Sequence, residues 1–455
     1  MDSKIVKFIE QNKNRYIEEL KSFLRIPSIS TDPNHRKDVR QCAEFVVEEL
    51  KDIGFKDAHV YDTPGHPIVF AQWLEAPGQP TVLFYGHYDV QPVDPLDLWK
   101  SPPFEPDIRN GEIYARGSAD DKGQVFMHFK SLEAHLKNTG RLPVNVKLLI
   151  EGEEECGSVN LDNFIEKHRE MLKADLVLIS DTPMFARGVP SICYGLRGLV
   201  YFQLDLVGTS TDLHSGSFGG AVANPAYVLS KLLAEMKDES GHITIPGFYD
   251  DVRPLTERER REYASLPFDP DKFRAEIGAP QLWGEKGFSP LEQIWARPTF
   301  EINGLLAGFT GEGAKTVIPA RAMAKVSMRL VPDQDPEKIA KLFENHVTKV
   351  CPKTVELKIT RMHGGKAWLA PIDHPAMQAA SRAYEKGFGK KPVFVREGGS
   401  IPVVATFAEL LKVPSVLIGI GLPDENAHAP NEKLDLGNFQ GGILSTAHLY
   451  QELAK

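Results

Sequence analysis

The sequence predicts an α/β domain that is interrupted by a smaller α+β domain. Up to about residue 195, and again after about 372, helical apolar spacing alternates with short apolar strand patterns. Between them, residues 197–372 combine half-exposed strand patterns with a Pro- and charge-rich stretch at 246–300. The length of 455 residues exceeds one ordinary core and favours two or three domains. We therefore expect one domain built from 1–196 and 373–455, with 197–372 inserted into it.

The first part of the chain predicts a mostly parallel sheet between helices. Its strand patterns are rich in Val, Leu and Ile on both faces, as is typical of strands buried between helix layers. In such domains ligands gather at the carboxyl ends of the strands, and polar residues are concentrated there in this sequence. The expected strands are 68–74, 81–90, 144–152 and 174–181, and the expected helices are 3–25, 38–53, 121–138 and 159–173.

The inserted segment predicts a small sheet covered by helices on one side. Its first strand alternates apolar and polar residues, which is typical of a strand with one exposed face. After residue 372 the first pattern returns, with a helix following Ser400 and another at the C-terminus. The expected elements of the insertion are strands 197–208, 299–303, 322–331 and 355–361 and helices 225–237 and 336–349; those that follow include helix 375–387 and strands near 393–397 and 415–421.

Composition excludes several classes of function. Lysine and arginine number 53 and aspartate and glutamate 62, so the formal net charge is −9. Nucleic-acid binding needs a dense basic surface, and we expect no such partner. No apolar run approaches the roughly 18 residues that span a bilayer, so we expect no membrane association. The four cysteines are far apart and form no CxxC pair, which favours a reducing, cytoplasmic location.

Histidines and carboxylates recur at strand ends and on Gly/Pro-punctuated loops. These residue types are the usual ligands of Zn²⁺ and related divalent ions, and clustered carboxylates without a cation repel one another. A single strand-end histidine or acidic run is more often structural or solvated, so the joint pattern carries the prediction of a metal site. The segments are GHYDVQP (86–92), ARGSADDKG (115–123), EGEEECGS (151–158), ISDTP (179–183) and NAHAPNE (426–432).

In these motifs and their order the chain resembles the M20 family of metallopeptidases, and within it the cytosolic dipeptidases related to carnosinase. The resemblance covers nearly the whole chain and includes the position of the insertion. It implies a zinc-peptidase-like catalytic domain that binds two divalent metal ions. Zn²⁺ is the ion first expected, with Mn²⁺ and Co²⁺ as alternatives. It also implies that the inserted α+β domain acts as a lid and as the dimerisation module of a homodimer.

The resemblance implies five metal ligands. His87 and Asp181 would bind one ion, Glu155 and His428 the other, and Asp120 would bridge the two. Hydrolytic metal pairs usually lie about 3.5–4 Å apart, and three carboxylates offset most of their charge. In relatives the peptide bond after the bridging aspartate is cis.

Two further residues of the same motifs receive roles. Asp89 lies two residues after His87, which puts both side chains on one face of a strand. The resemblance implies that its carboxylate accepts the other ring N–H of His87, although a turn-forming aspartate is the alternative. Glu154 is the expected general base, which takes a proton from the attacking water and delivers it to the leaving amine. Its choice over Glu153 rests on the resemblance.

The inserted domain supplies expected substrate contacts. His214 resembles the histidine that reaches into the partner subunit's site and stabilises the developing oxyanion; a loop-capping histidine is the alternative. Arg329 matches an arginine that pairs with the substrate's C-terminal carboxylate, for which its planar fork is suited. Thr316 and His363 match further substrate-contacting positions. The matching loop after 396 places Gly399 and Ser400 before a helix, where N–H groups favour anions; an ordinary N-capped turn is the alternative.

We therefore expect dinuclear hydrolysis of dipeptides, or very short peptides, that carry a free C-terminal carboxylate, by a metal-activated water with a glutamate base. An M20 carboxypeptidase or an N-acyl-amino-acid deacylase or desuccinylase would use the same fold and ligands. Phosphoester hydrolysis is disfavoured because no basic cluster surrounds the motifs. A non-catalytic scaffold is disfavoured because every expected ligand position and Glu154 is filled.

Overall fold

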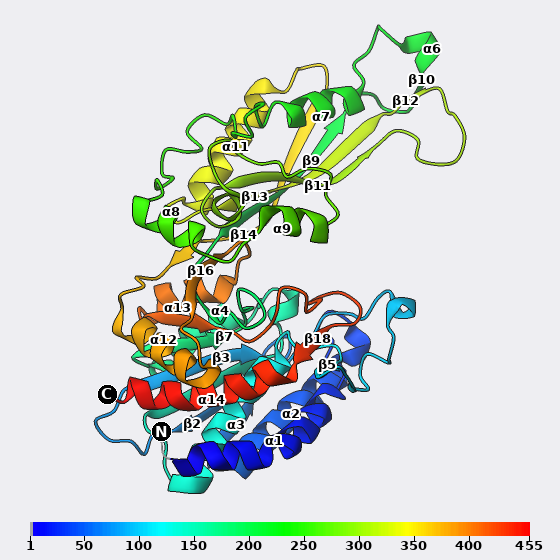
Figure 1. Cartoon of the computed structure of the whole chain (residues 1–455). Coiled ribbons are helices and arrows are strands. Elements are labelled where there is room, and N and C mark those ends of the chain that lie inside the picture. Colours follow the sequence, from blue (N-terminus) through cyan, green and yellow to red (C-terminus); the bar gives the residue numbers. More distant parts are fainter. Residues whose placement is uncertain (1–2) are drawn as a thin grey trace. The chain divides into compact units, whose positions relative to one another are not determined.

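The computed structural model describes residues 3–455, which form two compact units (Figure 1). Of the described residues, unit 1 contains 3–194, 370–395 and 406–455, and unit 2 contains 195–369 and 396–405. Both units mix helices and strands, so the predicted α/β class is confirmed. Within residues 3–455, no helix is long and apolar enough to cross a membrane.

Unit 1 is built on a mixed sheet whose strand order is β1-β2-β6-β3-β7-β17-β8. Strand β3 pairs in parallel with β6 and β7, and β17 pairs in parallel with β7, so these four strands end at the same edge. Their outer neighbours β2 and β8 are antiparallel. The strands are β1 (Asp57–Tyr61), β2 (Ile68–Trp73), β3 (Thr81–His87), β6 (Asn145–Glu151), β7 (Leu176–Ser180), β8 (Ser191–Leu196) and β17 (Ser415–Ile418).

Helices pack against this sheet and against one another. The neighbours α1, α3, α14 and α12 form a continuous series, and α3 and α12 also contact strands β3 and β17. Their apolar spacing explains this layer, since the face of α2 that carries Val39, Val46 and Leu50 is fully buried. The helices are α1 (Ser3–Leu24), α2 (Arg36–Ile53), α3 (Lys122–Thr139), α4 (Leu161–Lys167), α5 (Arg169–Leu172), α12 (Pro375–Phe388), α13 (Pro402–Leu410) and α14 (Leu436–Leu453).

Short elements complete the unit and show where the sequence prediction was inexact. The helix expected at 159–173 is broken into α4 and α5, because His168 adopts φ −111° and ψ 25°. The expected strand 81–90 ends at His87, where the chain turns into the loop that carries Asp89. The short elements are β4 (Asp107–Arg109), β5 (Glu112–Tyr114), β16 (Val393–Glu397), β18 (Lys433–Asp435) and the 3₁₀ turns η1 (Pro33–His35), η2 (Leu96–Leu98) and η3 (Glu154–Cys156).

Unit 2 contains an antiparallel sheet in the order β11-β13-β9-β14, with its core on one face. Alternate residues of β9, such as Val200 and Phe202, point into that core and meet apolar residues of helices α7 and α11. The other face of the sheet carries the intervening, partly exposed residues. The elements are β9 (Gly198–Val207), β11 (Thr299–Ala307), β13 (Arg321–Leu330), β14 (Glu356–Gly365), α7 (Pro225–Ala234) and α11 (Pro336–Val350).

The Pro- and charge-rich stretch 246–300 contains helices that the apolar pattern did not reveal. Each begins at a capping residue: Thr256 and Ser289 form capping boxes, and Asp269 accepts hydrogen bonds from two N–H groups. The further elements of unit 2 are α8 (Glu257–Ala264), α9 (Pro270–Glu276), α10 (Pro290–Trp295), α6 (Ser215–Phe218), β10 (Leu213–His214), β12 (Val317–Ile318) and β15 (Trp368–Leu369).

The division into units departs from the expected boundaries in one segment. We expected 373–455 to belong to a single domain, but 396–405 is part of unit 2. The reason is a set of long-range contacts: the Arg396 guanidinium pairs with Glu259, and the Arg197 N–H donates to the Gly399 carbonyl at 3.1 Å. The chain also passes between the units at 194–195 and at 369–370, near the expected ends of the insertion at 197 and 372.

We expect Phe343→Ala to destabilise unit 2 strongly. Phe343 is fully buried on α11, with its ring 4.7 Å from that of Phe202 and 6.2 Å from that of Phe300. Removal of such a ring costs about 3–5 kcal/mol. Urea unfolding followed by fluorescence should show a matching loss, whereas Phe309→Ala, at a side chain that is 46% exposed, should change stability by only about 0.5 kcal/mol. Equal effects of the two substitutions would contradict the assigned core.

Candidate metal centre

The parallel strands of unit 1 deliver polar residues to one edge of the sheet. His87 is the last residue of β3, Glu151 is the last residue of β6, and Asp181 directly follows β7. Because these strands run in the same direction, their carboxyl ends meet at this edge. The loop between β5 and α3 brings Asp120 to the same place, and its peptide bond to Asp121 is cis, as the resemblance implies.

Two groups of ligand-capable side chains form at this edge. His87, Asp120 and Asp181 each offer one ligand atom, and these atoms lie within 4.8 Å of one another. The same holds for Asp120, Glu155 and His428. The structure thus brings together the side chains that the sequence singled out as metal ligands, with Asp120 common to both groups.

Asp120 stands between two histidines from opposite parts of the chain. Its Oδ1 lies 3.1 Å from Nε2 of His87, and its Oδ2 lies 2.9 Å from Nε2 of His428. The second histidine also approaches Oε2 of Glu155, at 3.2 Å. Each carboxylate oxygen of Asp120 therefore faces a different group of ligands.

The chemistry of these groups fits two divalent cations. His87 is fully buried, and its Nε2 forms no hydrogen bond within the described residues. This nitrogen lies 3.1 Å from Oδ1 of Asp120, but not in the geometry of a hydrogen bond. Burial, and then the negative charge of Asp120, raises the pKa of Asp181 well above its usual value, and the same two causes raise the pKa of Glu155. Carboxylates held together against such repulsion call for positive charge, which bound cations supply.

A third acidic group in unit 1 shows the contrast. Glu19, Glu49 and Glu133 also lie within 4.8 Å of one another. They surround the ammonium of Lys130, whose Nζ lies 2.6 Å, 2.5 Å and 3.3 Å from the three carboxylates. A lysine already supplies the positive charge there, so this group is an internal ion-pair network.

Asp89 holds the turn that carries Glu154 and Glu155. Its Oδ1 accepts a hydrogen bond from the Glu154 N–H at 3.2 Å, and its Oδ2 accepts one from the Glu155 N–H at 3.0 Å. Nδ1 of His87 lies 3.2 Å from the backbone oxygen of Asp89 and 3.4 Å from Oδ1. In the structure the Asp89 carboxylate holds the 3₁₀ turn η3, and the hydrogen bond of Nδ1 of His87 is to the backbone oxygen of Asp89.

Glu154 lies beside the two ligand groups but belongs to neither. Burial raises its pKa to about 7, and the charges of Glu155 and Asp120 act in the same direction, partly offset by His87. A carboxylate whose pKa lies near neutrality can both accept and return a proton, as general acid–base catalysis requires.

Two expected substrate residues lie at the open face of the unit 2 sheet. Arg329 occupies a partly buried position of β13 that faces away from the core, and burial lowers the pKa of its guanidinium. The ring of His363 on β14 stacks on Tyr201 of β9, with 5.0 Å between ring centroids. Nη1 of Arg329 donates to Oγ of Ser400 at 2.8 Å, so the structure brings these two expected residues together.

The Gly399–Ser400 loop is tied to Arg197, a residue to which the sequence assigned no role. The Arg197 N–H donates to the Gly399 carbonyl, and Oγ of Ser400 donates to the Arg197 carbonyl. A side chain at Gly399 would meet nothing within 4 Å, so this position borders open space.

His214 and Thr316 form a separate pair on the small β10–β12 sheet. Nε2 of His214 lies 3.4 Å from Oγ1 of Thr316, and Nδ1 accepts a hydrogen bond from the Gly216 N–H at 3.1 Å. Both side chains are exposed. The β10–β12 sheet and α6 lie beyond the end of the main sheet at which β13 begins (Figure 1).

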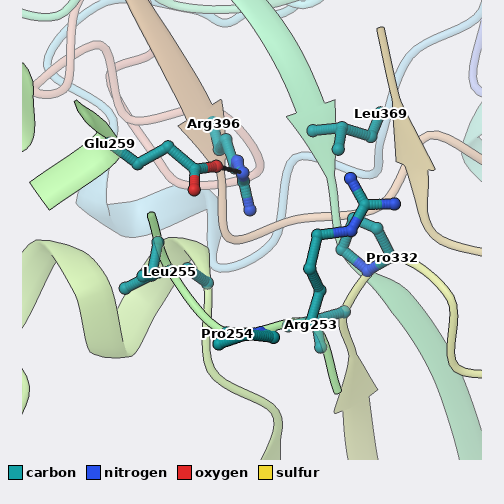
Figure 2. A pocket seen from close by; sticks show the side chains of 9 residues that line it. Arg253, Pro254, Leu255, Glu259, Pro332, Leu369 and Arg396 are labelled. Carbon is teal, nitrogen blue, oxygen red and sulfur yellow. Dashed lines mark hydrogen bonds and ion pairs between the residues drawn. The ribbon is translucent and has the colours of Figure 1, made fainter. Parts of the chain in front are cut away.

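A small cavity of unit 2 carries no site. It is lined by residues of α8 and of the chain around Pro332 and Arg396, and its volume is about 10 Å³, which is enough for one water molecule. Figure 2 shows the ion pair between Glu259 and Arg396 at its wall. This pair fixes the segment 396–405 to unit 2.

Comparison with known proteins places this chain in a family. The sequence profile described as "Peptidase family M20/M25/M40" matches residues 83–452. The chain belongs to this family. The Cys-Gly metallodipeptidase dug1 of Schizosaccharomyces pombe is 37% identical over 466 aligned positions, which cover 99% of this chain and 98% of the relative.

Solved structures agree with the M20 assignment. Human carnosine dipeptidase 1 has a TM-score of 0.86 and 32% identity, with 99% of this chain and 98% of that chain covered. The M20 metallo-carboxypeptidase Sso-CP2 from Sulfolobus solfataricus has a TM-score of 0.87 and 35% identity, with 96% and 99% covered. The predicted M20 metallopeptidase class and its similarity to dipeptidases of the carnosinase type are confirmed, as is the predicted fold.

Within this M20 site, sequence reasoning missed Glu432. This fully buried carboxylate accepts hydrogen bonds from the Arg116 guanidinium and from the N–H groups of Gly117, Ala119 and Asp120, at 2.8–3.1 Å. It therefore fixes the loop that presents Asp120. The NAHAPNE segment contains Glu432, but an acid on a polar loop gives no sequence signal of burial.

We expect Glu432→Gln to weaken metal binding about 10- to 100-fold, as is usual when a residue that orients metal ligands is changed. The amide would lose the charge that pairs with Arg116 and would direct an NH₂ group at N–H donors. Metal content after dialysis at graded chelator concentrations measures the change. Glu75→Gln is the matched control, because Glu75 contacts only the exposed Lys56, at 3.9 Å, among the ion pairs of the described residues. Unchanged metal retention in Glu432→Gln would contradict the proposal that Glu432 positions the loop that carries Asp120.

Proposed function

We propose that this protein is a metal-dependent dipeptidase that hydrolyses dipeptides, or very short peptides, with a free C-terminal carboxylate. The observation that carries the proposal is the pair of ligand groups that share Asp120, with Glu154 beside them. Family membership supports it, as do relatives with 37% and 32% identity whose names describe dipeptidases.

Two divalent cations would be held by His87, Asp120, Asp181, Glu155 and His428, and when bound they supply Lewis-acid activation of water and of the scissile carbonyl. Glu154 accepts the proton of the attacking water and returns it to the leaving amine. Asp89 keeps Glu154 in place through the backbone of η3. We assign Zn²⁺ as the first candidate ion, with Mn²⁺ and Co²⁺ as alternatives, because mixed histidine and carboxylate ligands suit all three.

Arg329 is the proposed partner of the substrate's C-terminal carboxylate, with Ser400 and Gly399 beside it. Its guanidinium already donates to Oγ of Ser400, and its other donors can form a bidentate pair with a carboxylate. His363 is assigned a further substrate contact from its place on the same open face, next to Tyr201. Recognition of the terminal carboxylate would select peptides with a free C-terminus.

We further propose that the enzyme works as a homodimer in which His214 and Thr316 serve the partner's site. Arg329 lies roughly 27 Å along β13 from Arg321, at about 3.4 Å per residue, and β12 with Thr316 lies beyond the Arg321 end. A dipeptide spans only about 7 Å. One copy of unit 2 therefore cannot bring both pairs to the same dipeptide, whereas two copies can. In this proposal unit 2 is the lid and dimerisation domain.

We place the enzyme in the cytoplasm. All four cysteines lie within residues 3–455, and none of them forms a disulfide there, including the exposed Cys156. Free thiols of this kind are typical of a reducing compartment.

Substrate class is tested with a panel of peptides. Free dipeptides, C-terminally amidated dipeptides, tripeptides and longer peptides, and N-acyl amino acids are compared after metal removal and after metal re-addition. A dipeptidase cleaves the free dipeptides best and needs the metal. Faster release of C-terminal residues from longer peptides would instead assign the carboxypeptidase activity for which Sso-CP2 is named, and faster cleavage of N-acyl amino acids would assign a deacylase.

We expect Glu154→Gln to keep its metal but lose turnover by about 10²- to 10⁴-fold, because the amide cannot accept a proton. Elemental analysis checks the metal, and steady-state hydrolysis checks kcat. Glu153→Gln is not a suitable control, since Glu153 accepts hydrogen bonds from His66 and Asn160. The suitable control is Glu166→Gln, because Glu166 lies on the exposed side of α4. Substantial residual turnover in Glu154→Gln would overturn its role.

Subunit mixing tests the placement of His214. His214→Ala and Glu154→Gln are each expected to be nearly inactive. If His214 acts in the partner's site, a hybrid dimer contains one site in which both residues are intact. Half of the dimers are hybrids after random exchange, so mixing should restore about a quarter of wild-type activity. No recovery, with exchange verified by mass spectrometry, would mean that His214 acts within its own subunit.

A further inference from the structure

We infer that Arg197 is a second carboxylate-binding residue, whose guanidinium acts together with that of Arg329 on the C-terminal carboxylate of the peptide. This inference rests on the proposed function and deepens it. It concerns residues of unit 2 only, and it assigns a specificity role to a side chain that the M20 resemblance did not single out.

Both arginines contact the same short loop from different segments of unit 2. Arg197 directly precedes β9, and its Nε donates to the carbonyl of Gly398 at 2.8 Å. Arg329 lies on the neighbouring strand β13 and donates to Oγ of Ser400, whose hydroxyl in turn donates to the backbone carbonyl of Arg197. The loop 398–400 thus holds two guanidinium groups close together.

The acids near these two arginines form their hydrogen bonds and ion pairs with other basic residues. Glu285 is engaged by Arg297 through two hydrogen bonds of 2.7 Å and 2.8 Å, and Glu301 is 3.2 Å from Nζ of Lys237. Within residues 3–455, Nη1 of Arg197 has no hydrogen-bond acceptor. Burial, and then the positive charge of Arg329, lower the pKa of Arg197 to about 10, although the negative charge of Glu301 acts in the opposite direction. A bound anion would relieve this repulsion.

A cavity of suitable size contains both arginines. Its volume is about 630 Å³, within the range of small-molecule sites, and Arg197 and Arg329 lie on its wall with Asn303 and Ser327 of the sheet. Further lining residues come from the stretch 246–300, including Phe273 and the largely exposed Trp283. Two guanidiniums at the wall of a partly apolar cavity suit a ligand with a carboxylate next to an amino-acid side chain.

The alternative is that Arg197 only ties the loop 398–400 to the sheet. A purely structural tie would affect all ligands equally, whereas a carboxylate contact would affect ligands according to their charge. The ratio of affinities for a free carboxylate and for the matching carboxamide therefore separates the two roles.

The test uses the metal-loaded, full-length enzyme and a dipeptide analogue with a reduced peptide bond, as the free acid and as the C-terminal amide. Isothermal titration calorimetry gives Kd, and hydrolysis of the parent dipeptides gives KM and kcat. For Arg197→Met we expect Kd and KM of the free acids to rise about 10- to 100-fold, the range of a lost charge-assisted hydrogen bond, with kcat and the amide Kd changed less than about 3-fold. Arg197→Lys, which keeps the charge, should retain part of the preference for the acid.

Arg361→Met is the matched control. Arg361 lies on the neighbouring strand β14 and pairs with Glu337 on α11, so the acid-to-amide ratio should stay at the wild-type value. Equal weakening of acid and amide by Arg197→Met would reduce Arg197 to a structural tie and overturn the inference. If Arg197→Met does not fold, an acid-to-amide affinity ratio in Arg197→Lys that equals the wild-type ratio overturns the inference. Failure of the wild-type enzyme to cleave any free dipeptide would overturn the proposed function itself, and is determined without any variant.

Discussion

The position of one carboxylate, that of Asp120, governs the whole metal centre. Its two oxygens face His87 and His428, which come from the first strand at this edge and from a loop near the C-terminus. Because Asp120 belongs to both groups of ligand-capable side chains, a displacement of its loop would disturb both groups at once. The protein accordingly holds this loop with a buried carboxylate, Glu432, which satisfies four hydrogen-bond donors around it. The cost of burying Glu432 is offset by Arg116 and by oriented backbone N–H groups.

A second buried carboxylate holds backbone N–H groups in the neighbouring turn η3. Asp89 uses both carboxylate oxygens to hold the backbone N–H groups of Glu154 and Glu155, one residue with a proposed proton-transfer role and one proposed ligand. Carboxylates proposed to bind cations are thus positioned by carboxylates that accept hydrogen bonds from backbone N–H groups. This arrangement gathers negative charge at the place where the two groups of ligand-capable side chains meet.

The sequence predicted the part of the site that follows from strand periodicity. His87 and Asp181 could be placed together because apolar strands of parallel type end just before them. His428 lies on a loop at φ 61°, where no strand or helix periodicity predicts its position. Its segment was singled out by its residue types, and its role as a ligand was implied by the resemblance. Glu432 and Arg197 were missed because their environments depend on partners 316 and 201 positions away along the chain. Long-range contacts also explain why segment 396–405 groups with unit 2, since Glu259 and Arg197 hold it.

The layout of unit 2 gives a physical reason for the composite active site that we propose. Arg329 and the loop 398–400 lie at one end of β13, and the His214–Thr316 pair lies beyond the other, so the strand separates them by more than a dipeptide can span. A strand is stiff along its length, and its hydrogen bonds to β9 and β11 exclude a fold that would bring its ends together. If both pairs contact one substrate, they must come from different copies of the chain. Assembly of two subunits would then be a condition for catalysis, and an isolated protomer would bind the carboxylate but lack the histidine.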